Sequence, residues 1–224
     1  MAIQLGFDLP PKPAMGREDF LIAPSNAMAV ALIDTWPKWE TGKLLLTGPT
    51  GSGKTHLTHV WAQRACAQIL QASDMTSANI PTLAEGPVAI EDIAQIAGQN
   101  DIETALFHLH NLVLANGHSL LLTGAGPLSS WDMKLPDLTS RLQAAAHAEL
   151  STPDDALLSA VLAKQFNDFQ VVPKPDVIPY LVGHMDRSFA TARDLARRLN
   201  HESLVRKKPI TRPLAADVLR QLAQ

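Results

Sequence analysis

The sequence predicts an α/β fold, with a parallel sheet flanked by helices, followed by a small helical domain toward the C-terminus. Three observations favour it. An apolar run, a glycine-rich loop and a helical segment follow one another over residues 43–65. Short apolar runs at 69–72, 87–93 and 119–123 end in polar residues, which is typical of buried parallel strands. After Ser151 the sequence shows only helical segments divided by prolines.

The composition narrows the class of protein. The chain has 224 residues, 46% of them apolar, enough for one large domain or two small ones with a proper core. A net charge of −3 argues against a broad basic face, so we expect no direct sequence-specific DNA binding. The single cysteine, Cys66, cannot form an internal disulfide and is expected to fill the core. Without a secretion signal or a membrane-spanning apolar run, the chain is expected to be cytoplasmic, with no membrane contact.

The first 17 residues are rich in proline and glycine and are expected to form an exposed tail. They nevertheless carry three large apolar side chains at alternate positions, Leu5, Phe7 and Leu9, after Gln4. Such a segment can insert apolar anchors into a partner's pocket while a polar side chain fixes the register. It can equally fold back on its own domain, and composition leaves both interpretations open.

The segments around the glycine-rich loop predict helix, strand and helix. A helix is expected from Ala27 to about Trp36, after the candidate cap Asn26. Residues 43–47 predict a short buried strand, and the next helix is expected to begin near Lys54.

The loop between them fits the pattern G-x-x-x-x-G-K-[ST] at every fixed position and predicts a phosphate-binding P-loop. Its glycines allow a tight turn that directs backbone N–H groups at phosphate oxygens. Lys54 can reach the β- and γ-phosphates, and the Thr55 hydroxyl can hold Mg²⁺. The alternative is an ordinary glycine turn. The candidate cofactor-binding residues are Gly48, Pro49, Thr50, Gly51, Ser52, Gly53, Lys54 and Thr55.

Two acids close the apolar run at 87–93. Glu91 and Asp92 follow three apolar residues, at the carboxyl end of an expected buried strand. This is the Walker B position, where one carboxylate helps to hold Mg²⁺ and the next orients the attacking water. The alternative is a pair of solvated acids at the end of a strand.

The region from Asp101 to Leu150 continues the α/β pattern. Asp101 is a candidate cap for a helix to about Asn116, which Gly117 closes. The strand 119–123 ends in Thr123, whose hydroxyl could sense the γ-phosphate or its water. A short helix around 138–142 and a last strand at 147–150 complete the expected sheet.

Helical segments occupy the remainder, at about 154–168, 176–184, 188–206 and 213–223. The expected organisation is therefore a tail at 1–17, an α/β nucleotide-binding domain at 18–150 and a helical domain at 151–224.

Several of these stretches together resemble the AAA+ domain of the DnaA family of bacterial replication initiators, over about residues 17–220. They are Gly48 to Leu57 with His59, Phe20-Leu21-Ile22 with Ser25-Asn26, Ile90-Glu91-Asp92-Ile93, Thr123-Gly124, and Leu138-Thr139-Ser140-Arg141-Leu142. The resemblance implies an AAA+ P-loop NTPase whose C-terminal helices form a lid. It adds His56 to the cofactor-binding residues and makes Thr123 the sensor 1 residue.

The resemblance also assigns roles to two arginines. Arg141 looks like the arginine finger, which acts on nucleotide held by a neighbouring subunit. A surface salt bridge is the alternative for this side chain. Arg193 matches the sensor 2 position in the lid, with Arg197 or Arg198 taking the role if the register differs. The alternative there is a solvated basic helix face.

The tail resembles a second known pattern. Gln4-Leu5-Gly6-Phe7-Asp8-Leu9 is similar to the hexapeptide with which proteins bind the DNA polymerase sliding clamp, through Gln4, Leu5, Phe7 and Leu9. A short AAA+ domain with such a motif resembles the Hda family of DnaA regulators. This implies a protein that binds the sliding clamp (β) and promotes hydrolysis of DnaA-bound ATP, which prevents over-initiation of replication. A homo-oligomer is also compatible with the resemblance.

One position departs from the family, which usually has aspartate where Glu91 stands. The metal geometry changes with the longer side chain. We therefore expect ADP or ATP with Mg²⁺ as cofactor, Thr55 and Glu91 as the metal ligands, and weak or no ATPase activity of the chain itself. Two other classes stay open: an autonomous AAA+ ATPase acting as helicase loader or remodeller, and a DNA-binding adaptor at the origin.

Overall fold

The computed structural model describes residues 16–17 and 20–222, so the predicted clamp motif at Gln4, Leu5, Phe7 and Leu9 lies outside the described residues. Five parallel strands form one sheet, in the order β2-β3-β4-β1-β5. Their bounds are β1 Lys43–Thr47, β2 Gln68–Gln71, β3 Val88–Glu91, β4 Leu120–Gly124 and β5 Ala146–Glu149. The sheet confirms the expected α/β class.

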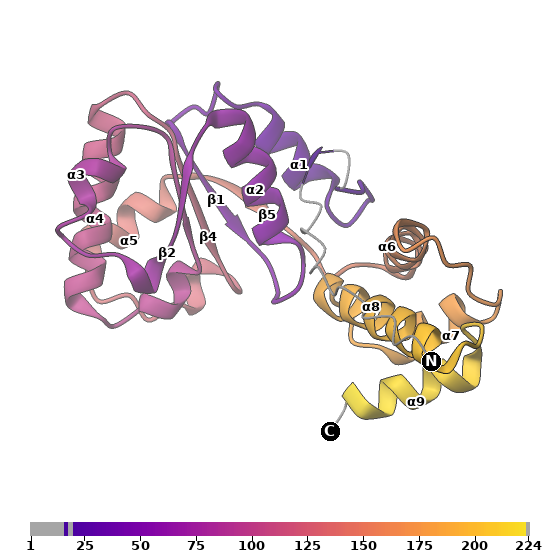
Figure 1. The fold of residues 1–224 in the computed structure, drawn as a ribbon. Helices are drawn as coiled ribbons and strands as arrows, with labels where there is room; N and C mark the ends of the chain where they lie inside the picture. Colours follow the sequence, from indigo (N-terminus) through magenta and orange to yellow (C-terminus); the bar gives the residue numbers. More distant parts are fainter. Residues whose placement is uncertain (1–15, 18–19, 223–224) are drawn as a thin grey trace, which may run out of the picture.

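Helices cover both faces of the sheet because its central strands are apolar on both sides. Leu44 and Leu46 of β1 pack in one cluster with α1 (Ala27–Asp34) and α2 (Lys54–Ala65). Leu45 packs in the cluster on the other face, with α3 (Ile80–Leu83), α4 (Asn100–Ala115) and α5 (Pro136–Gln143). Figure 1 shows these two helical layers on either side of the strands. Short 3₁₀ turns in the described residues of this part include η2 Ala72–Asp74, η3 Ile93–Ile96 and η4 Leu128–Ser130.

The C-terminal helices form a lobe of their own (Figure 1). They are α6 Asp155–Asp168, α7 Val177–His184, α8 Phe189–Arg206 and α9 Arg212–Leu222. Their apolar side chains form a separate cluster that shares no residue with the two clusters of the sheet. Within the described ranges, no helix is long and apolar enough to cross a lipid bilayer.

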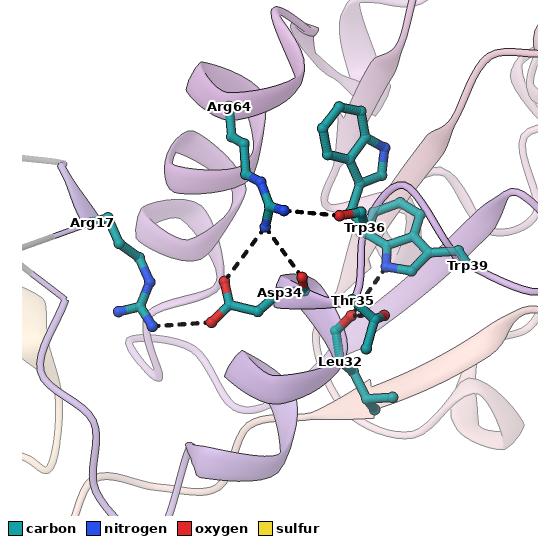
Figure 2. A network of polar contacts seen from close by, with 7 residues as sticks. All are labelled: Arg17, Leu32, Asp34, Thr35, Trp36, Trp39 and Arg64. Atoms are coloured by element: carbon teal, nitrogen blue, oxygen red, sulfur yellow. Dashed lines mark hydrogen bonds and ion pairs between the residues drawn. The ribbon is translucent and has the colours of Figure 1, made fainter.

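A polar network joins α1 to α2 and to the first described residues (Figure 2). The Arg17 Nη2 atom lies 3.0 Å from Asp34 Oδ2 at the end of α1. Arg64 of α2 donates to the backbone oxygens of Asp34 (3.2 Å) and Trp36 (3.0 Å). The guanidinium of Arg64 also lies over the Trp36 ring, 5.6 Å from its centroid. The chain at residue 17 is therefore fixed to the face of the α/β part that carries α1.

Some local predictions are wrong. The side chain of Asn26 does not cap α1, because its Oδ1 accepts from Ala23 N–H and its Nδ2 donates to Leu21 O. Asp101 lies inside the first turn of α4 and does not cap it. Cys66 is exposed in the left-handed residue that ends α2 and fills no core. The sequence did not predict helix α3, because four residues are too short to show a helical period.

Candidate functional site

The P-loop connects β1 to α2 as the sequence predicts, and two of its glycines have left-handed backbone angles. Gly51 has φ +78°, and a Cβ atom there would lie 2.7 Å from Ser188 Cβ. Gly53, with φ +99°, precedes α2, and a Cβ atom there would lie 3.1 Å from the Phe189 ring. Only glycine combines these angles with so close an approach. The amide N–H of Phe189 donates to Gly51 O at 3.1 Å, so the start of α8 lies directly on the loop.

Lys54 is the first residue of α2 and is almost buried, with 8% of its surface exposed. Its Nζ donates to the backbone oxygens of Gly48 (2.8 Å) and Pro49 (2.9 Å). Burial lowers the pKa of Lys54, while the charges of Asp92 and Glu91 oppose this shift. Both predicted Walker B acids therefore lie near enough to act on the P-loop lysine.

The two acids have different surroundings. Asp92 has a left-handed backbone (φ +57°), and its N–H donates to Thr123 Oγ1 at 3.2 Å. Its side chain lines the cavity described below. Glu91 is buried, and its Oε2 accepts from Gln71 Nε2 at 3.1 Å, while Oε1 has no hydrogen-bond partner among the described residues. Glu91 and Thr123 thus lie behind Asp92, at the carboxyl ends of β3 and β4.

A cavity of about 330 Å³ opens between the sheet and the C-terminal helices. The P-loop and the start of α2 line its base through Thr50, Gly51 and residues 53–56. Phe20 lies at one side, its ring in edge contact with His56 (centroids 5.1 Å apart). Residues of α6 and α8 close the opposite side. Phe20 belongs to a stretch that the sequence already marked, whereas Val161, Lys164, Gln165 and Phe189 are lining residues that the sequence did not single out. No local pattern marks them, because packing between distant segments brings them together.

Arg193 is the lid arginine that reaches this cavity. Arg197 and Arg198, the alternatives in the sequence, are exposed and pair with Asp194 at 2.5 and 2.8 Å. The Arg197 guanidinium holds the pKa of Asp194 below its ordinary value, with Arg198 acting in the same direction. Of these three arginines, Arg193 is the one that lines the cavity, and its sensor 2 role stays a prediction.

The donors of the cavity fit a phosphate group with a bound cation. The glycine-rich loop and the first turn of α2 present backbone N–H groups and the positive end of a helix. Ser52 Oγ and Glu91 Oε1 are buried, and neither has a hydrogen-bond partner within the described part of the chain. The exposed Thr55 hydroxyl and the carboxylates of Asp92 and Glu91 are oxygen ligands of the kind that Mg²⁺ prefers.

Arg141 lies far from this cavity. It belongs to the last turn of α5, which β5 follows in the chain. The first residue of β5 pairs with Leu44, near the amino end of β1. Its charge acts on Lys43, the first residue of β1, and on the buried His110. The P-loop starts at the other end of β1, roughly 13 Å away at the rise of a parallel strand. Arg141 is exposed and makes no hydrogen bond or ion pair within residues 16–17 and 20–222.

No family model matches the sequence. Among solved structures, domain III of the replication initiation protein DnaA from Thermotoga maritima is similar with a TM-score of 0.80 and 18% identity, over 93% of this chain and 97% of that one. DnaA from Aquifex aeolicus bound to AMPPCP has a TM-score of 0.69 and 18% identity, over 87% and 69%. The RuvB branch-migration motor of T. maritima has 0.68 and 17%, over 87% and 67%. The sheet with its C-terminal helices is therefore the AAA+ fold, in the form that domain III of DnaA also has.

Proposed function

We propose that the cavity binds ADP or ATP with Mg²⁺. The support is a P-loop with Lys54 at its base, buried polar atoms that lack partners in the described chain, and a lid arginine at the rim. Two of the similar DnaA structures hold AMPPCP, an adenine nucleotide analogue. In this proposal the loop and Lys54 bind the phosphates, Thr55 with Glu91 or Asp92 holds the cation, and Arg193 contacts the nucleotide from the lid.

We further propose that the protein regulates replication initiation by acting on ATP bound to DnaA. The observation that carries this proposal is the position of Arg141, exposed at the end of the sheet opposite the cavity. A guanidinium there is too far from the nucleotide of its own chain, and it is available to a nucleotide presented by another chain. An arginine supplied in this way neutralises charge as the γ-phosphoryl group leaves.

The tail is proposed to tether the protein to the DNA polymerase sliding clamp through Gln4, Leu5, Phe7 and Leu9. The ion pair between Arg17 and Asp34 fixes the chain to α1 just after this segment. The sequence between the motif and Arg17 is rich in proline, a composition suited to a spacer that gives a tether reach. The clamp would thereby raise the local concentration of the regulator at replicating DNA.

A second candidate is an autonomous AAA+ ATPase, acting as a helicase loader or remodeller. It is favoured by Asp92, which lines the cavity with Lys54 and Thr55 and is bonded through its N–H to Thr123. This candidate requires robust hydrolysis by the chain itself. The regulator requires little, since Glu91 replaces the usual aspartate and Arg141 performs its work on the partner's nucleotide.

The test is ATP hydrolysis by DnaA with this protein and sliding clamp loaded on DNA. We expect the wild-type protein to accelerate hydrolysis only when clamp is present, and Arg141→Ala to remove the acceleration. Gln4→Ala with Phe7→Ala should remove clamp binding and leave nucleotide binding unchanged. If DnaA is unaffected and the protein hydrolyses ATP alone, the autonomous ATPase replaces the regulator. If clamp affinity survives the double substitution, the role of the tail is wrong.

A further inference from the structure

Glu103 is a completely buried carboxylate in the first turn of α4, with 0% of its surface exposed. Its oxygens accept hydrogen bonds from three backbone N–H groups. Gly98 donates to Oε1 at 2.7 Å, Leu135 donates to Oε2 at 2.7 Å, and Lys134 donates to both oxygens at 3.1 and 2.9 Å. None of the ion pairs in the described part of the chain involves Glu103.

A buried carboxylate of this kind is expensive unless its oxygens are satisfied. Hydrogen bonds to an ionised acceptor are about twice as strong as neutral ones, and losing a partner leaves the remaining groups unsatisfied. The three N–H groups are therefore held tightly in place by Glu103. Among the described acids, Glu103 and Glu91 are the two that are buried, and Glu91 lies in the nucleotide site.

The bonded segments are the reason that this residue matters. Lys134 and Leu135 immediately precede Pro136, the first residue of α5, and Leu135 provides no side-chain cap for that helix. Glu103, from the neighbouring helix α4, fixes the chain at the start of α5 instead. Arg141 stands five residues further on in the same eight-residue helix, which runs beside α4 in Figure 1. A displacement at the start of so short a helix is transmitted to its last turn.

The hydrogen bond from Gly98 connects the same carboxylate to the segment that follows Asp92. Gly98 follows the 3₁₀ turn η3, which begins directly after Asp92. One side chain thus joins the segment behind the nucleotide site to the segment in front of Arg141.

We propose that Glu103 is a positioning residue for Arg141, which holds the start of α5 in register with the segment that follows Asp92. The inference rests on the proposed role of Arg141 in trans. Glu103 touches neither nucleotide, and it acts by setting where the guanidinium of Arg141 stands.

The experiment compares Glu103→Gln with wild type in the DnaA hydrolysis assay, with clamp loaded on DNA and the protein titrated to saturation. Glutamine keeps the shape but turns an N–H₂ group toward backbone donors. We expect the maximal rate to fall roughly 10- to 100-fold, the cost of a misplaced catalytic group, with an unchanged half-saturating concentration. A merely structural defect would reduce the folded fraction and shift that concentration instead. Asp101→Asn is the matched control, since it removes an exposed acid from the same helical turn.

Amide hydrogen exchange provides the second readout. Exchange at Lys134, Leu135 and the following residues should accelerate in Glu103→Gln, while ADP affinity of the protein itself stays unchanged. Should the glutamine variant fail to fold, Glu103→Asp keeps the charge but withdraws the carboxylate by one methylene group from the same N–H donors; it should lower the maximal rate in the same way.

The outcomes separate the two proposals. A full maximal rate in both variants, or unchanged exchange at Lys134 and Leu135, overturns the positioning role, as does a parallel loss of ADP affinity. If wild type and Arg141→Ala stimulate DnaA equally, the proposed function fails, and the exchange data alone decide whether Glu103 holds α5.

Discussion

The two ends of the parallel sheet differ in the surroundings of a positively charged side chain, Lys54 at the carboxyl end and Arg141 at the amino end. At the carboxyl end, Lys54 is almost buried, bonded to two loop carbonyls and faced by two acids. At the amino end, Arg141 is exposed, and no acid among the described residues pairs with it. The buried Lys43 beneath it has a histidine as its neighbour, with Lys43 Nζ 2.9 Å from His110 Nε2. At the carboxyl end the charge of Lys54 has partners within the chain, whereas at the amino end the charge of Arg141 faces solvent.

This difference suggests that the two ends have different tasks: nucleotide binding at the carboxyl end and the proposed action on another chain's nucleotide at the amino end. The proposed nucleotide cavity is built on glycines, a lysine and acids of one chain, and these groups already lie near one another. An arginine that lacks a counter-ion within the described chain is suited to an anion that comes from elsewhere. Substitutions at the two ends should therefore affect different measurements.

The largest effects are expected when the two charges are exchanged for alanine in separate variants. If Arg141 acts on DnaA as proposed, Arg141→Ala should lower the stimulated hydrolysis of DnaA-bound ATP by about 10³-fold or more, the range measured for arginine fingers. Lys54→Ala should weaken binding of a fluorescent ADP analogue by about 100-fold, equivalent to about 2.7 kcal/mol.

In the ADP-binding assay, Arg141→Ala should have nearly the wild-type affinity. Lys38→Ala, at an exposed lysine before β1, is the control for Lys54. Loss of ADP affinity in Arg141→Ala would contradict the separation of the two ends.

Gly51→Ala should destabilise the carboxyl end by about 1–3 kcal/mol in denaturant unfolding. An alanine Cβ atom would be strained at φ +78° and would lie 2.7 Å from Ser188 Cβ, at the start of α8. Gly117→Ala is the matched control, since Gly117 has φ +74° but no atom within 4 Å of the added Cβ. Equal losses in the two variants would mean that contact between the loop and α8 adds nothing to stability.

A smaller effect should sharpen the description of the lid. Arg193→Ala is expected to weaken ADP binding about tenfold, because this side chain lines the cavity. Arg197→Ala should change it less than twofold, since Arg197 is exposed and pairs with Asp194. Calorimetric titration of both variants measures the difference, and a larger effect from Arg197 would reverse the assignment.

The smallest effect concerns the amino end and acid pH. Burial lowers the pKa of His110 below its ordinary value of 6.5; the hydrogen bond to Asn111 opposes this, and the charges of Lys43 and Arg141 add to it. The unfolded chain therefore binds more protons than the folded one below pH 6.5, so stability falls as the pH drops through this range, by at most about 1.4 kcal/mol per pH unit.

Lys43→Met combined with His110→Leu should flatten that part of the stability curve, measured by urea unfolding between pH 7 and about pH 5. His108→Gln, at an exposed position of the same helix, should leave the curve in place. A double variant with the wild-type slope would show that His110 is not its source.

The sequence predicts the sheet and the loop well because their signals are local. Apolar runs of four to five residues and the P-loop pattern locate β1, β3, β4 and α2 within a residue or two. Each of the four C-terminal helices also begins and ends within two residues of its expected bounds. Prolines and glycines supply these limits, since they act on the backbone where they stand.

What the sequence misses depends on contacts between distant segments. Phe189 meets the P-loop across more than one hundred residues, and no spacing in the sequence marks it. Glu103 looks like an ordinary acid in a first helical turn, yet it is buried against residues 98, 134 and 135. The expected cap at Asn26 fails for a different, local reason, because its side chain bonds to Ala23 and Leu21 in the turn before α1.

The grouping of tryptophans has a practical consequence. Trp36, Trp39 and Trp61 lie together between α1 and α2, with ring centroids 5.3 and 6.3 Å from Trp61 (Figure 2 shows two of them). The fourth, Trp131, bonds to Ala125 O at 2.7 Å and covers Gly124 at the end of β4, near the cavity. Tryptophan fluorescence can therefore report on two regions separately. In Trp131→Phe the emission comes from the three tryptophans near α1 and α2. The difference between the wild-type and variant spectra gives the emission of Trp131, close to the cavity.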